Sequence, residues 1–142
     1  MTAIVYRLNP ENQSYREISR FELDQQPGQI LINDKGTRIV TFDGYFGMGY
    51  GDRVIAVMDG SGKDLKTWKL TDIYSQERID RMTMTTSNII WRSDVFMSRD
   101  DSVWITPPGA QFQSKDQLPN LKLDLKHLKL ERIQQVKLEG ID

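Results

Sequence analysis

The chain has 142 residues, with 19 Lys and Arg against 20 Asp and Glu, one histidine and no cysteine. The length predicts a single domain over residues 1–142, and the balanced charge gives no field that would attract nucleic acid or an anionic membrane surface. The lack of cysteine excludes disulfides, thiolate metal sites and cysteine nucleophiles, and a lone histidine excludes most histidine-based catalysis and metal binding.

The N-terminal residues lack the basic stretch and long apolar stretch that together mark a signal peptide, so we expect a cytoplasmic protein. No apolar run approaches the roughly 18 residues that a membrane helix needs. The mean hydropathy of -0.54 agrees with this, and we expect no membrane span.

Short β-branched and aromatic runs alternate with turn residues along most of the chain, a pattern typical of antiparallel β-structure. The turn Asn33–Gly36 is the clearest, because Asn and Asp start tight turns and Gly accepts positive φ. Four pairs of runs predict hairpins: 3–8 with 15–23, 29–32 with 37–42, 53–58 with 64–70, and 89–97 with 102–106.

Residues 71–82 change period, because Ile73, Ile79 and Met82 recur at helical spacing. This pattern predicts one short amphipathic helix, which Thr71 could cap.

The C-terminal part begins with a proline-rich stretch, residues 107–120, that we interpret as a loop. Residues 121–125 then alternate as a strand, and the alternation resumes one residue out of phase at residues 128–130. Such a phase slip indicates a β-bulge or a tight reversal at Lys126 and His127, and residues 132–138 are expected to form a last strand. The predicted fold class is mainly β, an antiparallel meander or sandwich with one short helix.

Two strings, residues 32–43 and 57–68, resemble the inner hairpins of β-propeller blades, in which an acidic, Gly-containing turn precedes a strand. The order of parts over residues 29–106 also resembles a group of uncharacterised small bacterial β-rich proteins, and this resemblance implies no particular activity. The Trp-Asp ending of a WD40 blade is absent, since Trp91 is followed by Arg92. A blade takes about 40–45 residues and a ring at least four blades, so the length excludes a complete propeller within one chain.

The segment Gly44–Gly51 is the most unusual, because four glycines are interspersed with three aromatic residues and a methionine. It is no phosphate loop, because a strand pattern follows it in place of a Lys-Ser/Thr helix start. Its aromatic side chains either cover the end of the core or form a contact patch for a protein or a sugar ring. The candidate ligand- or partner-binding residues are Tyr45, Phe46, Met48, Tyr50 and Asp52.

Two further segments are weaker candidates for a metal or catalytic site. Asp59–Asp64 begins like a calcium loop, but Leu70 stands where the bidentate glutamate belongs, so a hairpin turn is the simpler interpretation. His127 lies among charged residues with no nucleophile motif nearby, which predicts an exposed strand or turn histidine.

Carboxylate pairs such as Asp43 with Asp52, or Asp100 with Asp101, are residue types that glycoside hydrolysis uses. Aspartate is also common in turns, which explains all four residues more simply. We therefore predict no catalytic residue, no cofactor and no metal.

The function expected from these observations is that of a non-enzymatic protein-interaction domain. One alternative is a carbohydrate or small-ligand binder, or a weak hydrolase, that uses residues 44–51. A second alternative is an immunity or inhibitor protein. Exposed strand edges in a β-rich fold also predict possible homo-oligomers through a strand edge.

Overall fold

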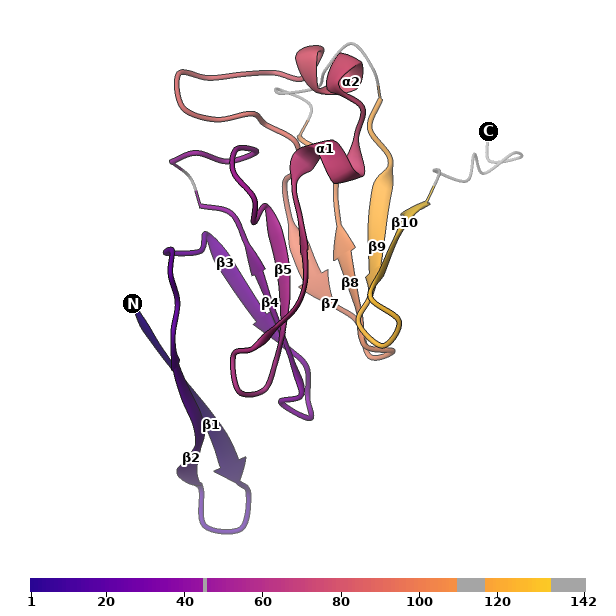
Figure 1. Ribbon diagram of the computed structural model, residues 1–142. Helices are drawn as coiled ribbons and strands as arrows, with labels where there is room; N and C mark the ends of the chain where they lie inside the picture. Colours follow the sequence, from indigo (N-terminus) through magenta and orange to yellow (C-terminus); the bar gives the residue numbers. More distant parts are fainter. Residues whose placement is uncertain (45, 110–116, 134–142) are drawn as a thin grey trace, which may run out of the picture.

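The computed structural model describes residues 1–44, 46–109 and 117–133, and this part of the chain is mainly β, as the alternation predicted (Figure 1). Its elements in chain order are β1 (Thr2–Asn9), β2 (Ser14–Glu22), β3 (Gln29–Ile32), β4 (Arg38–Phe42), β5 (Ile55–Asp59), β6 (Asp64–Trp68), α1 (Leu70–Ile73), α2 (Gln76–Asp80), β7 (Val95–Met97), β8 (Ser102–Ile105), β9 (Asn120–Asp124) and β10 (Lys129–Ile133).

The strands form three antiparallel sheets, and each four-stranded sheet is a meander of neighbouring strands. One sheet is the hairpin β1–β2, the second has the order β3-β4-β5-β6, and the third has the order β10-β9-β8-β7. All four predicted hairpins are present, although β7 begins only at Val95 and the preceding residues 89–94 belong to connecting structure. Of the two explanations for the phase slip at Lys126 and His127, the reversal is the one found, since it joins β9 to β10. The resemblance to propeller blades stays a prediction.

The facing sides of the two four-stranded sheets share one apolar core. Because side chains of a strand alternate between its faces, Val40 and Phe42 of β4 point into this core from one sheet. Val103 and Ile105 of β8 enter it from the other sheet, and all four side chains are buried. The helices α1 and α2 lie across one end of the sheets (Figure 1) and add Ile73 and Ile79 among other residues.

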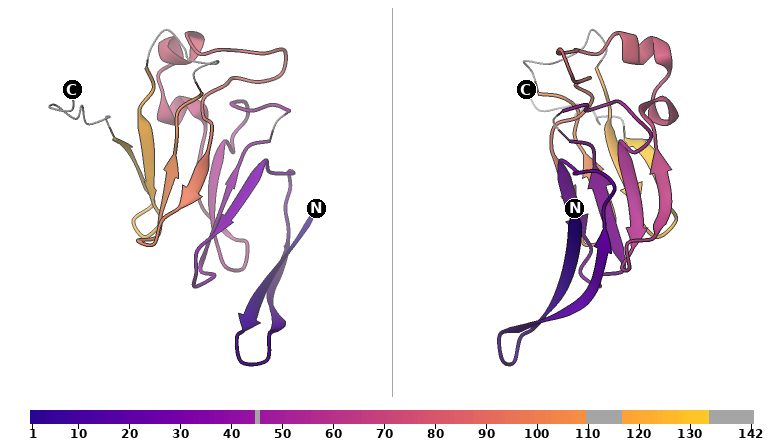
Figure 2. Two further views of the ribbon diagram at one scale, coloured as in Figure 1. Left: turned by 180° about the vertical axis from the view of Figure 1, so that it is seen from behind. Right: turned by 60° about the vertical axis from the view of Figure 1, so that its left-hand side comes forward.

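The β1–β2 hairpin covers part of the opposite face of the β3–β6 sheet and otherwise projects from the body (Figures 1 and 2). A second cluster forms there, in which Ile39 and Met58 of the sheet pack with Leu23 and the hairpin residues Val5 and Phe21. An isolated two-stranded sheet has little stability in water, so these contacts hold the hairpin in place.

The segment predicted as one helix contains two, because the backbone between them is extended. Tyr74 has φ -130° and ψ 151°, and the Ser75 side chain then accepts a hydrogen bond from the Arg78 amide at 3.3 Å, which caps α2. The apolar side of the predicted helix is nevertheless buried, as its spacing indicated. No helix of the described residues is long and apolar enough to cross a membrane.

Candidate functional site

The loop after β4 is attached to the protein body by the buried carboxylate of Asp43. This carboxylate accepts hydrogen bonds from the Gly49 amide and, at 3.3 Å, from Nε1 of Trp91. It also forms an ion pair with Arg92, whose Nη2 lies 3.5 Å from Oδ1, and both side chains are at least nine-tenths buried. Burial raises the pKa of Asp43, although the Gly49 amide and the Arg92 charge act in the opposite direction.

Arg92 connects three parts of the chain around this carboxylate. Its Nη1 donates to Oε1 of Gln29 at 3.0 Å, and its Nη2 donates to the main-chain oxygen of Asp43 at 3.0 Å. Its guanidinium group also lies over the ring of Phe42, 5.2 Å from the ring centroid. Burial lowers the pKa of Arg92, and the charge and the hydrogen bond of Asp43 oppose that shift.

The tip of the loop is held by Asn88, a buried residue of the neighbouring loop 83–88. Its Oδ1 accepts hydrogen bonds from the amides of Gly47 at 3.0 Å and Met48 at 2.9 Å. Gly49 has φ +85°, and a β-carbon there would lie 2.7 Å from Cβ of Ile89, so only glycine allows this close approach. The loop is therefore docked on the protein at several points.

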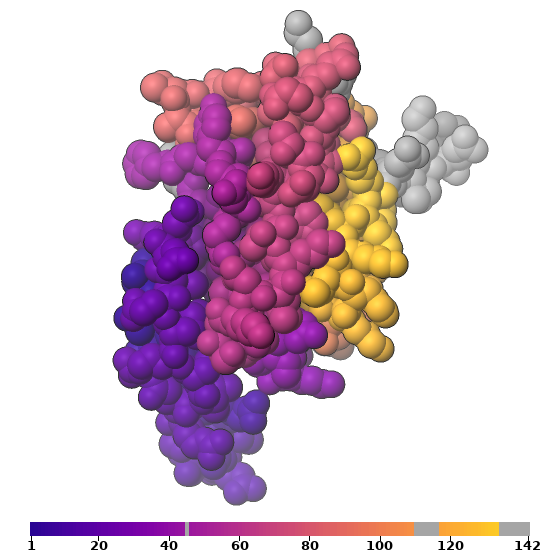
Figure 3. All heavy atoms as spheres, viewed as in Figure 1, coloured from indigo at the N-terminus to yellow at the C-terminus, as the bar shows by residue number. Residues whose placement is uncertain are grey.

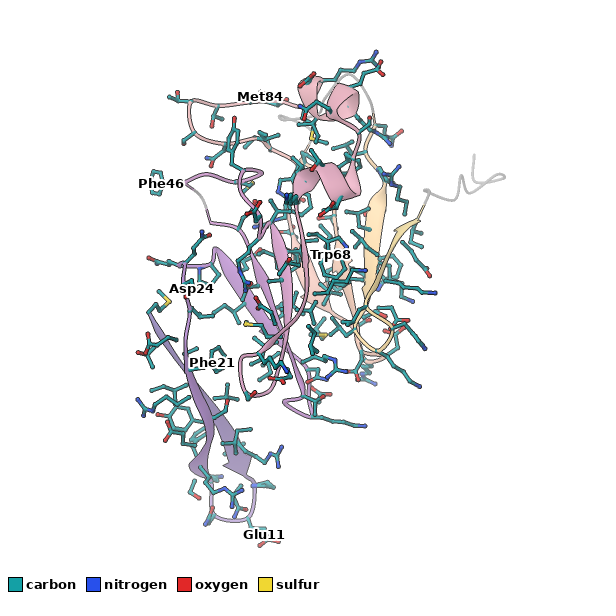
Figure 4. The ribbon with its side chains drawn as sticks, viewed as in Figure 1. Glu11, Phe21, Asp24, Phe46, Trp68 and Met84 are labelled. Carbon is teal, nitrogen blue, oxygen red and sulfur yellow. The ribbon has the colours of Figure 1, made fainter. Side chains whose placement is uncertain are left out.

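The structure distributes the predicted binding residues between surface and core. Phe46 is 90% exposed and points away from the body (Figure 4), and Tyr50 is 53% exposed. Met48 is half-buried and packs against the main core. The exposed Asp52 pairs with Nζ of Lys69 at 3.6 Å, and Tyr45 lies outside the described residues.

A polar cleft of about 440 Å³ separates this loop from the segment that leads from β2 to β3. Phe46, Tyr50 and Arg53 line it from the loop, and Gln25 and Gln26 line it from the opposite segment. Arg53 is held by two hydrogen bonds to the carboxylate of Asp64, which raise the pKa of the arginine. In Figure 3 the loop and its neighbour 83–88 stand out from the upper left of the molecule.

The other candidate residues have roles in turns. The Asp59 carboxylate accepts hydrogen bonds from the amides of Ser61 at 2.9 Å and Lys63 at 3.0 Å inside the β5–β6 turn. His127 is exposed in the β9–β10 turn, where its Nδ1 lies 2.7 Å from Oδ2 of Asp124. Within residues 1–44, 46–109 and 117–133, no group of three or more His, Cys, Asp or Glu side chains could hold a metal ion.

Sequence reasoning did not identify Asn88, Arg92 or the Gln25–Gln26 side of the cleft. An arginine directly after the apolar residues Ile89–Trp91 is the signal in the sequence that could have indicated a special role for Arg92. Comparisons of the sequence and structure with family models, curated proteins and solved structures found no match.

Proposed function

We propose that this domain is a non-enzymatic binding domain that contacts a partner protein through residues 46–53, with Phe46 as the anchor. The observation that carries the proposal is the 90% exposure of Phe46 on a loop whose backbone is fixed by buried groups. An exposed phenylalanine costs the folded protein solubility and adds little to its stability. A bound partner would gain from burying it.

The rigid attachment of the loop supports this role. Asn88 accepts hydrogen bonds from the amides of Gly47 and Met48, and Asp43 accepts one from that of Gly49, so the backbone directly after Phe46 is held before any partner arrives. Because this backbone is already ordered, binding loses less conformational entropy, and aromatic anchors commonly dominate interface energies.

The surface around Phe46 offers further apolar contacts. Tyr50 on the same loop is 53% exposed, and Met84 on the adjoining loop is 48% exposed. Figure 4 shows Phe46 and Met84 on the same side of the molecule. These side chains would surround the anchor in an interface of ordinary composition, in which Met and aromatic residues are enriched.

The test compares two phenylalanines of similar chemistry at different places. Phe46→Ala is expected to weaken partner binding by roughly 1–4 kcal/mol and to leave the melting temperature nearly unchanged. Phe96, which is 50% exposed on β7, is the control, and Phe96→Ala should bind like the wild type. Proteins captured from native lysate are quantified for the three forms, and affinities are then measured by calorimetry.

A different pattern would contradict the proposal. If Phe46→Ala melts several degrees lower and binds normally once the folded fraction is considered, the loop serves only to cover the core.

The cleft beside the loop favours a second candidate, a binder of neutral carbohydrates or similar small ligands. Gln25 and Gln26 line it together with the aromatic residues Phe46 and Tyr50, a combination that suits a hydroxyl-rich ligand with apolar faces. The charges of Asp43 and Arg53 are already paired, by Arg92 and Asp64. Titration of the isotope-labelled protein with neutral oligosaccharides tests this: shifts confined to the cleft and lost in Gln26→Ala would support it.

The hydrolase alternative has less support from the geometry. Asp43 lines the cleft, but its carboxylate is occupied by the Gly49 amide, Trp91 and Arg92. Asp52 pairs with Lys69 and is not among the described residues that line the cleft. We therefore assign no hydrolytic residue.

A further inference from the structure

The outer edge of the β3–β6 sheet has main-chain groups that point away from it. Strand β3 pairs only with β4, and the amide of Asn33 donates to the Arg38 oxygen at 3.1 Å in the same register. Because hydrogen-bonded pairs alternate along an antiparallel ladder, Gln29 and Leu31 face β4. The N–H and C=O groups of Ile30 and Ile32 consequently face outward.

The pairing on the other side of β4 confirms this alternation. The Asp43 amide donates to the Val54 oxygen at 3.1 Å, which extends the β4–β5 ladder and directs the main-chain groups of Thr41 and Ile39 toward β5. Val40 and Phe42 therefore face β3. Within the described residues, the outward groups of Ile30 and Ile32 form no hydrogen bond to another part of the chain.

An apolar groove of about 320 Å³ lies beside this free edge. The hairpin covers Ile39 and Met58 in the middle of the sheet face but leaves the β3 side of that face open. The groove is lined there by Ile4 and Tyr6 of β1, 36% and 53% exposed, and by Ile30 and Ile32, 48% and 43% exposed. An unprotected edge strand next to apolar side chains is a surface on which another strand can pair.

We propose that the strand that occupies this edge is β3 of a second copy of the chain, paired antiparallel about a two-fold axis at Leu31. In that register Ile30 lies opposite Ile32 of the second copy, and each such pair exchanges two main-chain hydrogen bonds. The same groups are free on both copies, so the edge is complementary to itself.

The charge of the strand also favours a second copy. Residues 29–32 include no charged side chain, so two such edges meet without like-charge repulsion. A standard stable interface buries about 1,600 Å² in total, more than a four-residue strand and its groove offer. The dimer is therefore weak, and its population depends on protein concentration.

The primary test measures mass against concentration by sedimentation equilibrium for the wild type and two lysine variants. The wild type is expected to pass from monomer to dimer mass as concentration rises, and Ile30→Lys to raise the dissociation constant at least about tenfold. Leu65→Lys is the matched control, because Leu65 is 38% exposed on β6, the opposite edge strand of the same sheet. That variant should dimerise like the wild type.

A second measurement does not depend on how well a variant folds. Amide exchange at Ile30 and Ile32 of the wild type should slow as concentration rises, and exchange at Gln29 and Leu31 should not change. A wild type that stays monomeric at its highest soluble concentration overturns the proposal, as does equal dimerisation of Ile30→Lys and Leu65→Lys. None of these residues belongs to the loop around Phe46, so failure here is separate from failure of the proposed function.

Discussion

At the scale of single residues, the ion pair between Asp43 and Arg92 is the feature on which the loop depends. Breaking a buried pair leaves a buried charge without a partner, which is costlier than losing an exposed pair such as Asp52 with Lys69. Asp43 and Asp52, which the sequence alone could not distinguish, thus differ in burial, in their partners and in how much stability their loss would cost.

The raised pKa of Asp43 predicts how stability changes with pH. An acid whose pKa is higher in the folded than in the unfolded protein binds its proton more tightly when folded. It therefore stabilises the fold below its ordinary pKa of 3.8, and this contribution disappears as the pH rises through the raised value. The free energy of unfolding of the wild type, relative to that of the non-titrating variant Asp43→Asn, should decrease as the pH rises from about 4.

Urea unfolding of both proteins across this pH range checks the prediction. Asp52→Asn is the control for replacing an exposed aspartate of the same loop, and its free energy of unfolding at neutral pH should be close to that of the wild type. If the free energy of unfolding of the wild type instead rises relative to that of Asp43→Asn toward neutral pH, the attraction of Arg92 outweighs the cost of burial.

At the scale of elements, local turn chemistry was readable from the sequence. Asn33 illustrates why: its Oδ1 accepts the amides of Thr37 at 2.9 Å and Arg38 at 3.0 Å, and Gly36 has φ +68°. Each of these contacts joins residues at most five apart, so the pattern of the turn specifies its own geometry.

Elements whose form depends on distant residues were predicted less well. Residues 89–94 alternate like a strand, yet they lie outside β7 because Ile89 packs against Gly49 and Arg92 is directed to Asp43. The acidic partner of Arg92, Asp43, is 49 residues away, and no local pattern could reveal it. The break at Tyr74 between α1 and α2 depends on Ser75 as a cap, which competed in the sequence with the periodicity of a longer helix.

The β1–β2 hairpin allows a prediction at this scale, because the ring of Phe21 is one of the side chains that pack it against the sheet. The Phe21 ring lies so close to Gly62 that a β-carbon there would be 2.2 Å from the ring, and Figure 4 shows Phe21 on the hairpin beside the sheet. Phe21→Ala should release the hairpin while the two four-stranded sheets stay folded, since an isolated hairpin is barely stable. Hydrogen exchange of residues 2–22 should become fast, and that of residues 38–42 should change little.

Tyr6→Ala is the control for Phe21→Ala, because Tyr6 is half-exposed and lies outside the cluster around Phe21, and it should preserve the protection of the hairpin. Uniform loss of protection in all three sheets of the Phe21→Ala variant would contradict the prediction.

At the scale of the whole molecule, both four-stranded sheets contribute to one apolar core, so they should unfold together. Val57 of β5 and Val103 of β8 are both fully buried in it, one from each sheet. Val57→Ala and Val103→Ala should each lower the free energy of unfolding by roughly 2 kcal/mol and leave a single transition. Near- and far-ultraviolet circular dichroism should give the same midpoint for each variant, and two separate transitions would show that the sheets are independent units.

The candidate site could be predicted only in part, because some of its residues are adjacent in sequence and others are brought together only by the fold. The aromatic residues of loop 44–51 were visible because they are adjacent in sequence, and Phe46 and Tyr50 are indeed exposed. The cleft beside them was not visible, because its other wall, residues 24–27, comes from a segment brought there by the fold.

The attachment of this loop to Asn88 also fixes when the surface can first exist. Asn88 follows Gly47 by 41 residues, and Arg92 comes later still. At synthesis rates of about 5–20 residues per second, a new chain carries Phe46 for roughly 2–8 seconds before Asn88 has even been added. A partner that needs the docked loop can therefore bind only chains whose translation has passed Arg92, so assembly cannot begin while Phe46 is exposed on a chain that still lacks Asn88 and Arg92.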